Sequence, residues 1–407
     1  MSVPPLHIRS WSEQDFGQSR AEWQSLLARS AADPLFMSWD WQWRWWKHHA
    51  EYLRATLRLQ GLYTASGELV GIAAFHVREV RFRGLVKLRR MELLGGAWRD
   101  SGAAFSEYLD LIAARGYEDA VLAAVAAALQ ADQGWHDLAL PCLKPNSLAS
   151  RLAREHIGGF THVREVDAME ACSASLEGTF SAYVEKLSSG TRRRLLHHRR
   201  KLDQPALLAA GPAEVEELMQ SMRNFEQLRW GPKSDRQYRF SCDFALAQAE
   251  MGTLRLTKLL AGGRILSVMY NVRIGDTEYY LQSAFDGRGT QGLSPGYLHF
   301  GYRMESAALE GVTRFDFLAG PGRHRDYKQD LLTVRFPLIS CHAVRLNWLR
   351  WLHGIRDALH RPRAAGRPGG GPIVSQFVAL PTACAAQCRQ SKPPGRAFRR
   401  PHRPGEL

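Results

Sequence analysis

The sequence lacks long hydrophobic runs and closely paired cysteines, and its first residues lack the pattern of a signal peptide. None of its 407 residues belongs to a run of eighteen or more apolar residues, so we expect no membrane-spanning helix. The amino terminus has neither the charged nor the apolar segment of a signal peptide, and we therefore expect a cytoplasmic protein. The six cysteines are scattered, without a CxxC pair or histidines at zinc-binding spacing. This pattern predicts reduced cysteines, no disulfide framework and no metal site.

The positive charge is concentrated at the carboxyl end. Of the formal net charge of +14, residues 361–407 carry +8, because nine basic residues there accompany one acid. The rest of the chain is only moderately basic, and no recognised nucleic-acid-binding motif accompanies it, so nucleic acid is a less favoured partner. Residues 361–407 are also rich in proline, glycine and arginine, a composition that predicts disorder.

The order of predicted elements repeats along the chain. The first copy has three strands, a helix and a further strand, at 56–63, 69–77, 85–94, 118–131 and 137–140. The second copy has the same order, at 253–260, 264–273, 277–285, 295–310 and 314–318. We therefore predict an α+β fold of two tandem domains, each a mixed, mostly antiparallel sheet flanked by helices. We expect a first domain at 1–172, a basic helical connector at 173–205, a second domain at 206–360 and a disordered tail at 361–407.

The loop before the second predicted helix carries the sharpest local signal. Ser294 suits the N-cap position, and Pro295 suits the first helical position, where its missing N–H costs nothing. The glycines of this loop, including Gly292, let a ligand approach the backbone closely. The free N–H groups from Gly296 onward and the positive end of the helix dipole can then hold a phosphate. An ordinary strand-to-helix turn is the simpler alternative, because glycine and Ser-Pro serve there too.

The second copy resembles the acyl-CoA core of the GNAT (N-acetyltransferase) superfamily. The shared order is antiparallel strands, a helix whose start can bind phosphate, another strand and then Tyr327-Lys328. The usual loop of that family reads Gln/Arg-x-x-Gly-x-Gly/Ala. Here Gln291 and Gly296 keep its first and last positions, while Ser294 stands where glycine is usual. The resemblance implies acetyl-CoA or another acyl-CoA as cosubstrate, without a metal. It further implies that the pyrophosphate is bound by Gln291, Gly292, Ser294, Gly296 and Tyr297.

A closer resemblance, over roughly residues 10–345, is to the bacterial CelD-like branch, which is associated with cellulose or exopolysaccharide production and related to the FemAB aminoacyl transferases. Its features occur here in order: a tryptophan-rich segment at 39–46 after Asp33-Pro34-Leu35-Phe36, a basic helix at 191–202, Leu228-Arg229-Trp230, Leu293-Ser294-Pro295-Gly296, Asp316–Gly320 and Tyr327-Lys328. The resemblance implies an N- or O-acyltransferase. It would move an acyl group, such as acetyl, to an amine or hydroxyl of a sugar, a nucleotide-sugar or a related metabolite.

Acyl transfer needs a base for the acceptor and an acid for the thiolate leaving group. Tyr327 follows the last core strand, as the general acid of many GNAT enzymes does, so the resemblance assigns it thiolate protonation. Asp316 alternates with two phenylalanines on a short strand, so we expect it to face away from them and to act as the base or to orient one. Lys328, Arg193 and Arg194 are candidates for binding the acceptor or a phosphate. A hydrogen-bonded polar pair near the sheet edge is the structural alternative for Asp316 and Tyr327.

Several alternatives stay open. Asp286 and His299 are further candidates for the base. The basic run at 192–201 can bind a phosphorylated acceptor, a nucleotide-linked sugar, an acidic polysaccharide or tRNA, or can be a solvated face. A FemAB-like transferase that uses aminoacyl-tRNA and a non-catalytic scaffold for polysaccharide synthesis are therefore alternative functions. In the first copy, Glu118 and Asp119 at the helix start would repel phosphate, so we expect that half to be degenerate.

Overall fold

The computed structural model describes residues 6–82, 84–231, 234–288, 292–319, 326–331 and 334–351. The described residues all belong to one compact unit. The tail predicted at 361–407 lies outside the described residues. None of the described helices is long and apolar enough to cross a bilayer.

The first half is an antiparallel meander preceded by helices and followed by a helix and a parallel strand. The chain begins with β1 (His7–Trp11), α1 (Glu13–Gln18), α2 (Arg20–Ala28) and α3 (Trp39–Leu53). It continues with β2 (Thr56–Tyr63), β3 (Leu69–Phe82), β4 (Val86–Leu93) and the short β5 (Ile112–Ala113). Helix α4 (Glu118–Ala131) then leads to β6 (Asp137–Leu143), which runs parallel to β4.

The second half repeats this order after a connecting region. The connection contains α5 (Leu148–Arg151), η1 (Leu152–His156), β7 (His162–Ser175), α6 (Phe180–Glu185), α7 (Ser189–Leu195) and η2 (His197–Lys201). The meander and its helices are β8 (Ala206–Ala209), η3 (Pro212–Glu214), α8 (Val215–Trp230), α9 (Asp235–Glu250), β9 (Leu254–Ala261), β10 (Arg264–Ile274) and β11 (Thr277–Phe285). Then follow α10 (Pro295–Leu309), β12 (Arg314–Asp316), α11 (Asp326–Leu331) and β13 (Val334–Val344), with β12 parallel to β11.

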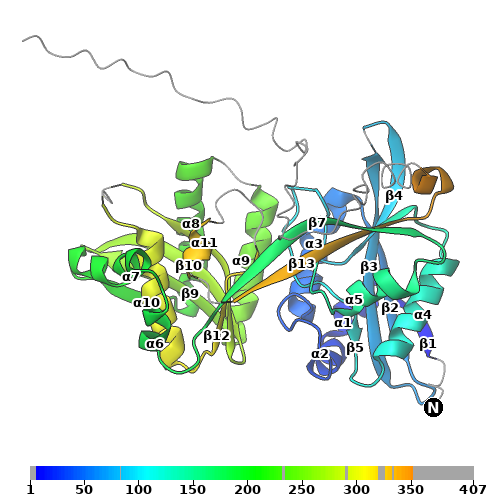
Figure 1. The fold of residues 1–407 in the computed structure, drawn as a ribbon, viewed down its shortest axis with the longest axis horizontal. Coiled ribbons are helices and arrows are strands. Elements are labelled where there is room, and N and C mark those ends of the chain that lie inside the picture. Colours follow the sequence, from blue (N-terminus) through cyan, green and yellow to red (C-terminus); the bar gives the residue numbers. More distant parts are fainter. Residues whose placement is uncertain are drawn as a thin grey trace, which may run out of the picture. The chain divides into compact units, whose positions relative to one another are not determined.

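Strands from both halves form one continuous sheet in the described part of the chain. Its order is β1-β2-β3-β4-β6-β13-β7-β12-β11-β10-β9-β8, with β5 beside β3. Strand β7 leaves the first half and pairs with β12, whereas β13 leaves the second half and pairs with β6. The two exchanged strands pair with each other in the centre, where Figure 1 shows them running side by side. Each half thus contributes its last strand to the other.

The predicted α+β class and the repeated order of meander, helix and strand are confirmed. The domain boundaries at 172, 205 and 360 stay predictions. The long basic helix expected at 191–202 is not formed, because α7 ends at Leu195 and a separate 3-10 turn, η2, follows. Like charges one turn apart disfavour a longer helix, which accounts for the break.

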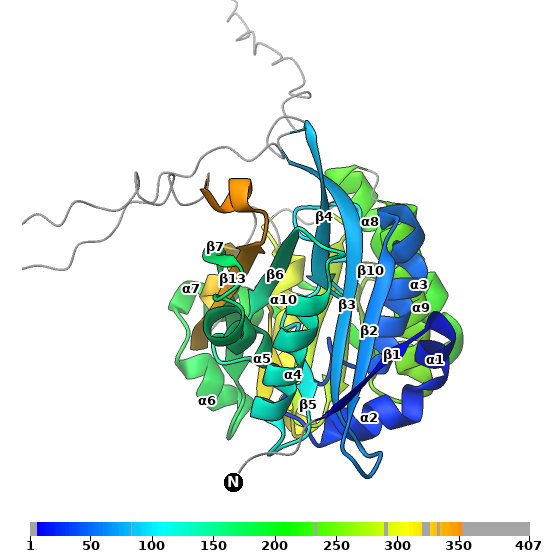
Figure 2. The ribbon, with the colours of Figure 1, turned by 90° about the vertical axis from the view of Figure 1, so that its right-hand side faces the viewer.

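Helices of the two halves pack against each other on one face of the sheet. Helix α3 contacts α9, and Figure 2 shows the two lying side by side. Trp39, Trp41, Trp45 and Trp46 of α3 are buried, so the tryptophan-rich segment serves core packing. Trp41 also borders the cavity described below.

Helix α10 is fixed to β11 by a buried ion pair. The guanidinium of Arg303 donates to both carboxylate oxygens of Glu278, at 2.7 Å each, and Glu278 also accepts from the Asn271 amide at 2.6 Å. Both charged side chains are almost completely buried. Removal of one partner from such a pair is strongly destabilising, so this contact holds α10 in a defined position on the sheet.

Replacing Gly301 with alanine is expected to destabilise the protein. A Cβ at this position of α10 would collide with the backbone carbonyl of Leu195 at the end of α7. Because that neighbour is backbone, we expect the free energy of unfolding to fall by about 1–3 kcal/mol, as measured in urea. The matched control is Gly159→Ala, where a Cβ meets open space. Equal stability of the two variants would contradict the close packing of α7 on α10.

Candidate active site

In the second half, strands β11 and β12 form a short parallel pairing and then diverge. Residues Thr277–Tyr279 of β11 pair with Arg314–Asp316 of β12. Beyond this point, no described strand pairs with the β12 side of β11, although β11 continues to Phe285. The parting exposes backbone groups of β11 in the interior of the protein, where they need hydrogen-bond partners.

A β-bulge adjoins the point where the strands part. Tyr270 of β10 faces Gln282 of β11, whereas the next residue, Asn271, faces Tyr280. Leu281 is therefore the extra residue on β11. A bulge of this kind redirects the side chains that follow it and is common beside functional sites.

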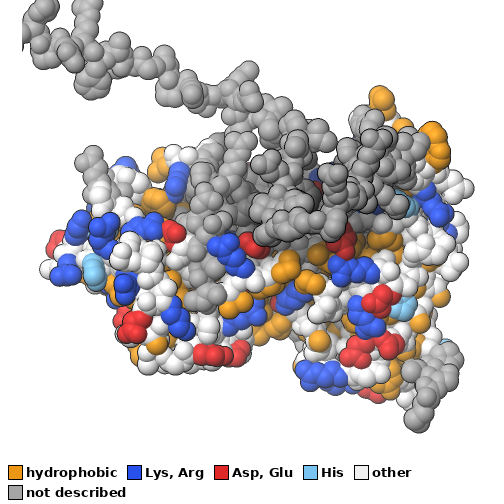
Figure 3. Space-filling view, in the orientation of Figure 1, with side chains coloured by type: hydrophobic (Ala, Val, Ile, Leu, Met, Phe, Trp, Pro, Cys, Tyr) orange, Lys and Arg blue, Asp and Glu red, His pale blue; other side chains and the backbone are white. Residues whose placement is uncertain are grey.

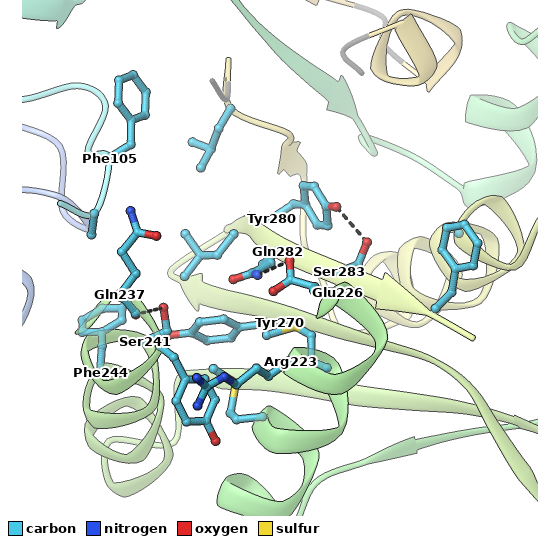
Figure 4. A pocket seen from close by; sticks show the side chains of 18 of the residues that line it. Phe105, Arg223, Glu226, Gln237, Ser241, Phe244, Tyr270, Tyr280, Gln282 and Ser283 are labelled. Atoms are coloured by element: carbon cyan, nitrogen blue, oxygen red, sulfur yellow. Dashed lines mark hydrogen bonds between the residues drawn. The ribbon is translucent and has the colours of Figure 1, made fainter. Parts of the chain in front are cut away.

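A cavity of about 780 Å³ lies at this parting. Its first-half wall includes Trp41, Ala104, Phe105 and Glu107. The second half contributes residues of α8, α9, β10, β11 and the start of α10. Figure 4 shows side chains from the second half converging on it. Its size suits a small-molecule ligand. The described residues contain no group of three or more His, Cys, Asp or Glu arranged to hold a metal ion.

The first turn of α10 borders the cavity. The helix begins at Pro295, as predicted, and Ser294, Gly296 and Tyr297 line the cavity. Ser294 occupies the N-cap position, as predicted, although its hydroxyl makes no capping hydrogen bond. Gly292 has a φ of +72°, a backbone conformation that favours glycine, and it does not line the cavity. Gln291 lies outside the described residues.

Glu226 is a candidate functional residue that the sequence analysis missed. It lies on α8, is 5% exposed and lines the cavity. The Gln282 side chain donates to its carboxylate at 2.5 Å, and Figure 4 shows this pair. The only local signal is its position just before the Leu-Arg-Trp motif at 228–230, because Gln282 is distant in sequence. A buried carboxylate at a cavity is a candidate general base.

Lys328 lies on α11 and lines the same cavity as the start of α10. Its side chain is buried, and its ammonium donates to the carbonyl oxygens of Phe317 at 2.6 Å and Leu318 at 3.2 Å. These carbonyls directly follow β12. Lys328 therefore holds the segment on the β12 side of the parting strands, and the structure brings it together with Ser294, Gly296 and Tyr297.

Asp316 lies beside the cavity rather than in its lining. It is buried, accepts from the Tyr108 hydroxyl at 3.1 Å and pairs with Arg314 at 2.9 Å. Burial raises the pKa of this carboxyl, although Arg314 opposes the shift. The predicted alternation is confirmed, because Phe315 and Phe317 pack together in a separate apolar cluster. The catalytic role of Asp316 stays a prediction.

The remaining predicted residues lie on α7 and α11. Tyr327 is within α11, and its side chain is outside the described part of the chain, so its role as general acid stays a prediction. Arg194 donates to Asp330 at 2.7 Å and stacks 4.0 Å from the Tyr297 ring, which ties α7 to α10 and α11. Arg193 is exposed on α7, where Figure 3 shows basic side chains gathered. Neither arginine lines the cavity.

The two further base candidates are engaged elsewhere in the second half. His299 of α10 is fully buried between the hydroxyls of Thr257 and Ser267, at 2.8 and 2.6 Å. Burial lowers its pKa to about 3. Asp286 is paired with Arg288, whose hydrogen bonds lower the pKa of the carboxyl to about 2. Neither residue lines the cavity, so neither is placed to act as the base there.

Acidification is expected to destabilise the protein through His299. Between its unfolded pKa of 6.5 and its folded pKa of about 3, the unfolded chain binds a proton that the folded protein excludes. The contribution of the neutral histidine is complete above the unfolded pKa and is lost as the pH falls through this window. At about pH 5 we expect a loss of about 2 kcal/mol relative to about pH 7.5, measured by urea unfolding. His299→Gln should remove this difference; a variant with unchanged pH dependence would disprove the assignment.

Acidic side chains occupy the start of α4, the first-half counterpart of α10. The Glu118 carboxylate accepts from the Gly116 N–H at 2.7 Å, and Asp119 pairs with Arg151 at 2.7 Å. Negative charge at a helix N-terminus repels phosphate, in line with the expectation of a degenerate first half. That expectation stays a prediction.

Comparisons with known proteins agree with this architecture. Residues 189–329 match the acetyltransferase (GNAT) domain family. The fold is similar to FemX, with a TM-score of 0.56 and 11% identity over 85% of this chain and 99% of that one. It is also similar to a conserved protein of unknown function from Bacteroides thetaiotaomicron VPI-5482, with a TM-score of 0.52 and 11% identity over 84% of this chain and all of that one. No curated protein matches in sequence.

These comparisons leave the CelD-like assignment and the link to cellulose or exopolysaccharide untested. The matched region contains the parting strands, the start of α10 and Glu226. Over residues 189–329 the second half of this mixed α+β fold therefore resembles a GNAT-type acetyltransferase domain.

Proposed function

We propose that this protein transfers an acyl group from acyl-CoA to an amine or hydroxyl acceptor. The observation that carries the proposal is the parting of β11 and β12 at a cavity bordered by the start of α10 and by Glu226. In this arrangement the proposed donor site and the candidate base lie near the same point of the sheet. The GNAT-type domain supports the same class of chemistry.

The donor is proposed to lie along α10 and β11. Its pyrophosphate accepts from the first-turn amides at Gly296 and Tyr297, and Gly292 lets the loop backbone approach it. The contact of Gln291 with the pyrophosphate stays a prediction from the sequence. The stretch of β11 after Tyr279 offers backbone groups to the pantetheine arm and an N–H to the thioester oxygen.

The proposed reaction is a direct transfer. Glu226 takes a proton from the attacking amine or hydroxyl, a bond forms between the acceptor atom and the thioester carbon, and the C–S bond breaks. The oxyanion that forms in between accepts from the β11 backbone. The thiolate then takes a proton from Tyr327, as predicted from the sequence, or from Tyr280. The Tyr280 hydroxyl bonds with that of Ser283 at 2.8 Å at the cavity wall.

Asp316 and Arg194 are proposed to position the site rather than to contact the substrate. The Tyr108–Asp316 hydrogen bond joins the first half to β12, next to the parting strands. Arg194, through Asp330, holds Tyr297 in the first turn of α10. Arg193 remains a candidate for binding an anionic group at the surface.

The more specific proposal, a sugar or nucleotide-sugar acceptor in polysaccharide or cell-envelope biosynthesis, rests on the CelD-like resemblance.

A second candidate function is a FemAB-like transferase with aminoacyl-tRNA as donor. The observation that favours it is the exposed basic surface of α7 and η2, which includes Arg193, Arg200 and Lys201. Phosphate backbones bind such surfaces with a strong dependence on salt.

Calorimetry with acetyl-CoA and with tRNA, each at two salt concentrations, separates the two candidates. We expect acetyl-CoA to bind at both concentrations and tRNA to bind weakly, with an affinity that falls steeply at the higher one. Specific tRNA binding without acetyl-CoA binding would favour the second candidate. A protein that binds neither would point to the non-catalytic scaffold.

A further inference from the structure

Large hydrophobic side chains are exposed together where the β3–β4 hairpin lies beside a helical turn at 347–351. Leu85, at the tip of the hairpin, is 84% exposed, Trp351 is 66% exposed, and Val86 and Trp348 are exposed as well. The Trp348 ring meets the Phe82 ring edge to face, at a centroid distance of 6.0 Å, and Phe82 pairs with Val86 across the hairpin. The four exposed residues therefore form one apolar surface, which we call the hairpin patch.

The hairpin patch has a packed support. Leu349 of the helical turn is buried in a small cluster with Leu88 of β4 and Val344 of β13. The Arg350 N–H donates to the Leu346 carbonyl oxygen at 2.9 Å, which closes the turn. Figure 2 shows the hairpin projecting beyond the neighbouring helices, and Figure 3 shows hydrophobic side chains at its end. Exposed apolar groups that gather in this way mark a surface for a protein partner or a membrane.

Basic side chains accompany the hairpin patch. Arg81 and Lys87 pair with each other across the hairpin and are exposed, and Arg350 lies on the helical turn. Lys87 is 2.9 Å from Glu79, whereas no described carboxylate pairs with Arg81 or Arg350. The sequence adds a charge of +8 at 361–407, shortly after the patch. Positive charge beside exposed apolar groups complements a surface that is anionic outside and apolar within.

We propose that the hairpin patch binds the surface of a membrane that contains anionic lipids. Leu85 and Val86 enter the boundary between headgroups and acyl chains, and the tryptophan rings lie at the headgroup level, where such rings are enriched. Arg81 and Arg350 attract the lipid phosphates. A second copy of the chain would also cover the apolar groups, but it would bring like charges together, so a membrane is the better match. This attachment goes beyond the proposed acyl transfer and does not depend on it.

Co-sedimentation with lipid vesicles tests this inference on the full-length protein. We expect binding to vesicles of equal parts phosphatidylcholine and phosphatidylglycerol, and weaker binding to phosphatidylcholine alone. Leu85→Ser and Trp351→Ser should each weaken binding to the mixed vesicles about tenfold or more, because each removes a large apolar group from the interface. Arg81→Gln should weaken binding about fivefold at low salt and have little effect at high salt, where charges are screened.

The matched control is Leu309→Ser. Leu309 is 87% exposed at the end of α10, outside the hairpin patch, so this variant should bind vesicles as the unchanged protein does. Leu85 and Trp351 lie on different elements, so either variant tests the patch if thermal unfolding shows the other to be misfolded.

Three results would overturn the inference. Equal vesicle binding by Leu85→Ser, Trp351→Ser and Leu309→Ser would show that charge elsewhere in the chain attracts the lipid. Vesicle binding that is absent in the unchanged protein would exclude a membrane as the partner. A dimer in sedimentation velocity that Leu85→Ser dissolves, without vesicle binding, would assign the patch to a second copy of the chain.

Discussion

Replacing Glu226 with glutamine is expected to lower kcat/KM for acyl transfer by about 10²–10⁴-fold, the range typical of a general base. The substitution keeps the shape of the side chain, and its amide can still contact Gln282, so the fold should be retained. What is lost is the ability to take a proton from the acceptor. The measurement is the release of free thiol from acetyl-CoA with an amine acceptor.

Kinetic and unfolding measurements together distinguish a base from a merely structural carboxylate. Glu226→Gln should lose activity while its thermal unfolding stays that of the unchanged protein. Glu217→Gln, on the solvent side of α8, should keep both rate and stability. A Glu226→Gln variant with a normal rate would show that another group takes the proton from the acceptor.

Replacing Ser294 with aspartate is expected to weaken acetyl-CoA binding by about 100-fold or more. The residue precedes the first turn of α10, where the pyrophosphate is proposed to bind, so the new carboxylate would face like charge. Two unit charges about 4 Å apart repel by about 4 kcal/mol at a dielectric typical of protein surfaces, and solvent screening reduces this. Calorimetry with acetyl-CoA measures the change.

Two controls isolate the charge from the loss of the hydroxyl. Ser294→Ala should bind acetyl-CoA almost normally, because the hydroxyl makes no capping hydrogen bond. Ser66→Asp adds the same charge in the exposed turn between β2 and β3, outside the cavity, and should also bind normally. Normal binding by Ser294→Asp would place the pyrophosphate away from α10.

Local patterns predicted much of the fold. In the second half, alternating apolar residues bounded by glycine turns placed three strands within a residue or so of β9, β10 and β11, and Pro295 marked the start of α10. Alternation also placed Asp316 opposite Phe315 and Phe317. These features depend on neighbours a few residues away, which the sequence displays directly.

The rest depends on contacts between distant segments. The exchange of β7 and β13 joins strands more than 150 residues apart, so it has no local signature. Glu226 lies on an ordinary amphipathic helix, and only its approach to Gln282 and the cavity marks it. Lys328 was chosen for its charge, yet its position comes from carbonyls that follow β12. The sequence therefore predicted the type of site and some of its residues, but not how the residues come together in space.

A crystal structure of the protein with acetyl-CoA tests the central claim most directly. The account predicts a pyrophosphate within about 3 Å of the amide nitrogens of Gly296 and Tyr297, with the pantetheine arm along β11 beyond Tyr279. A cofactor bound beside α4 in the first half, or a cavity closed by side chains while the cofactor lies elsewhere, would contradict it.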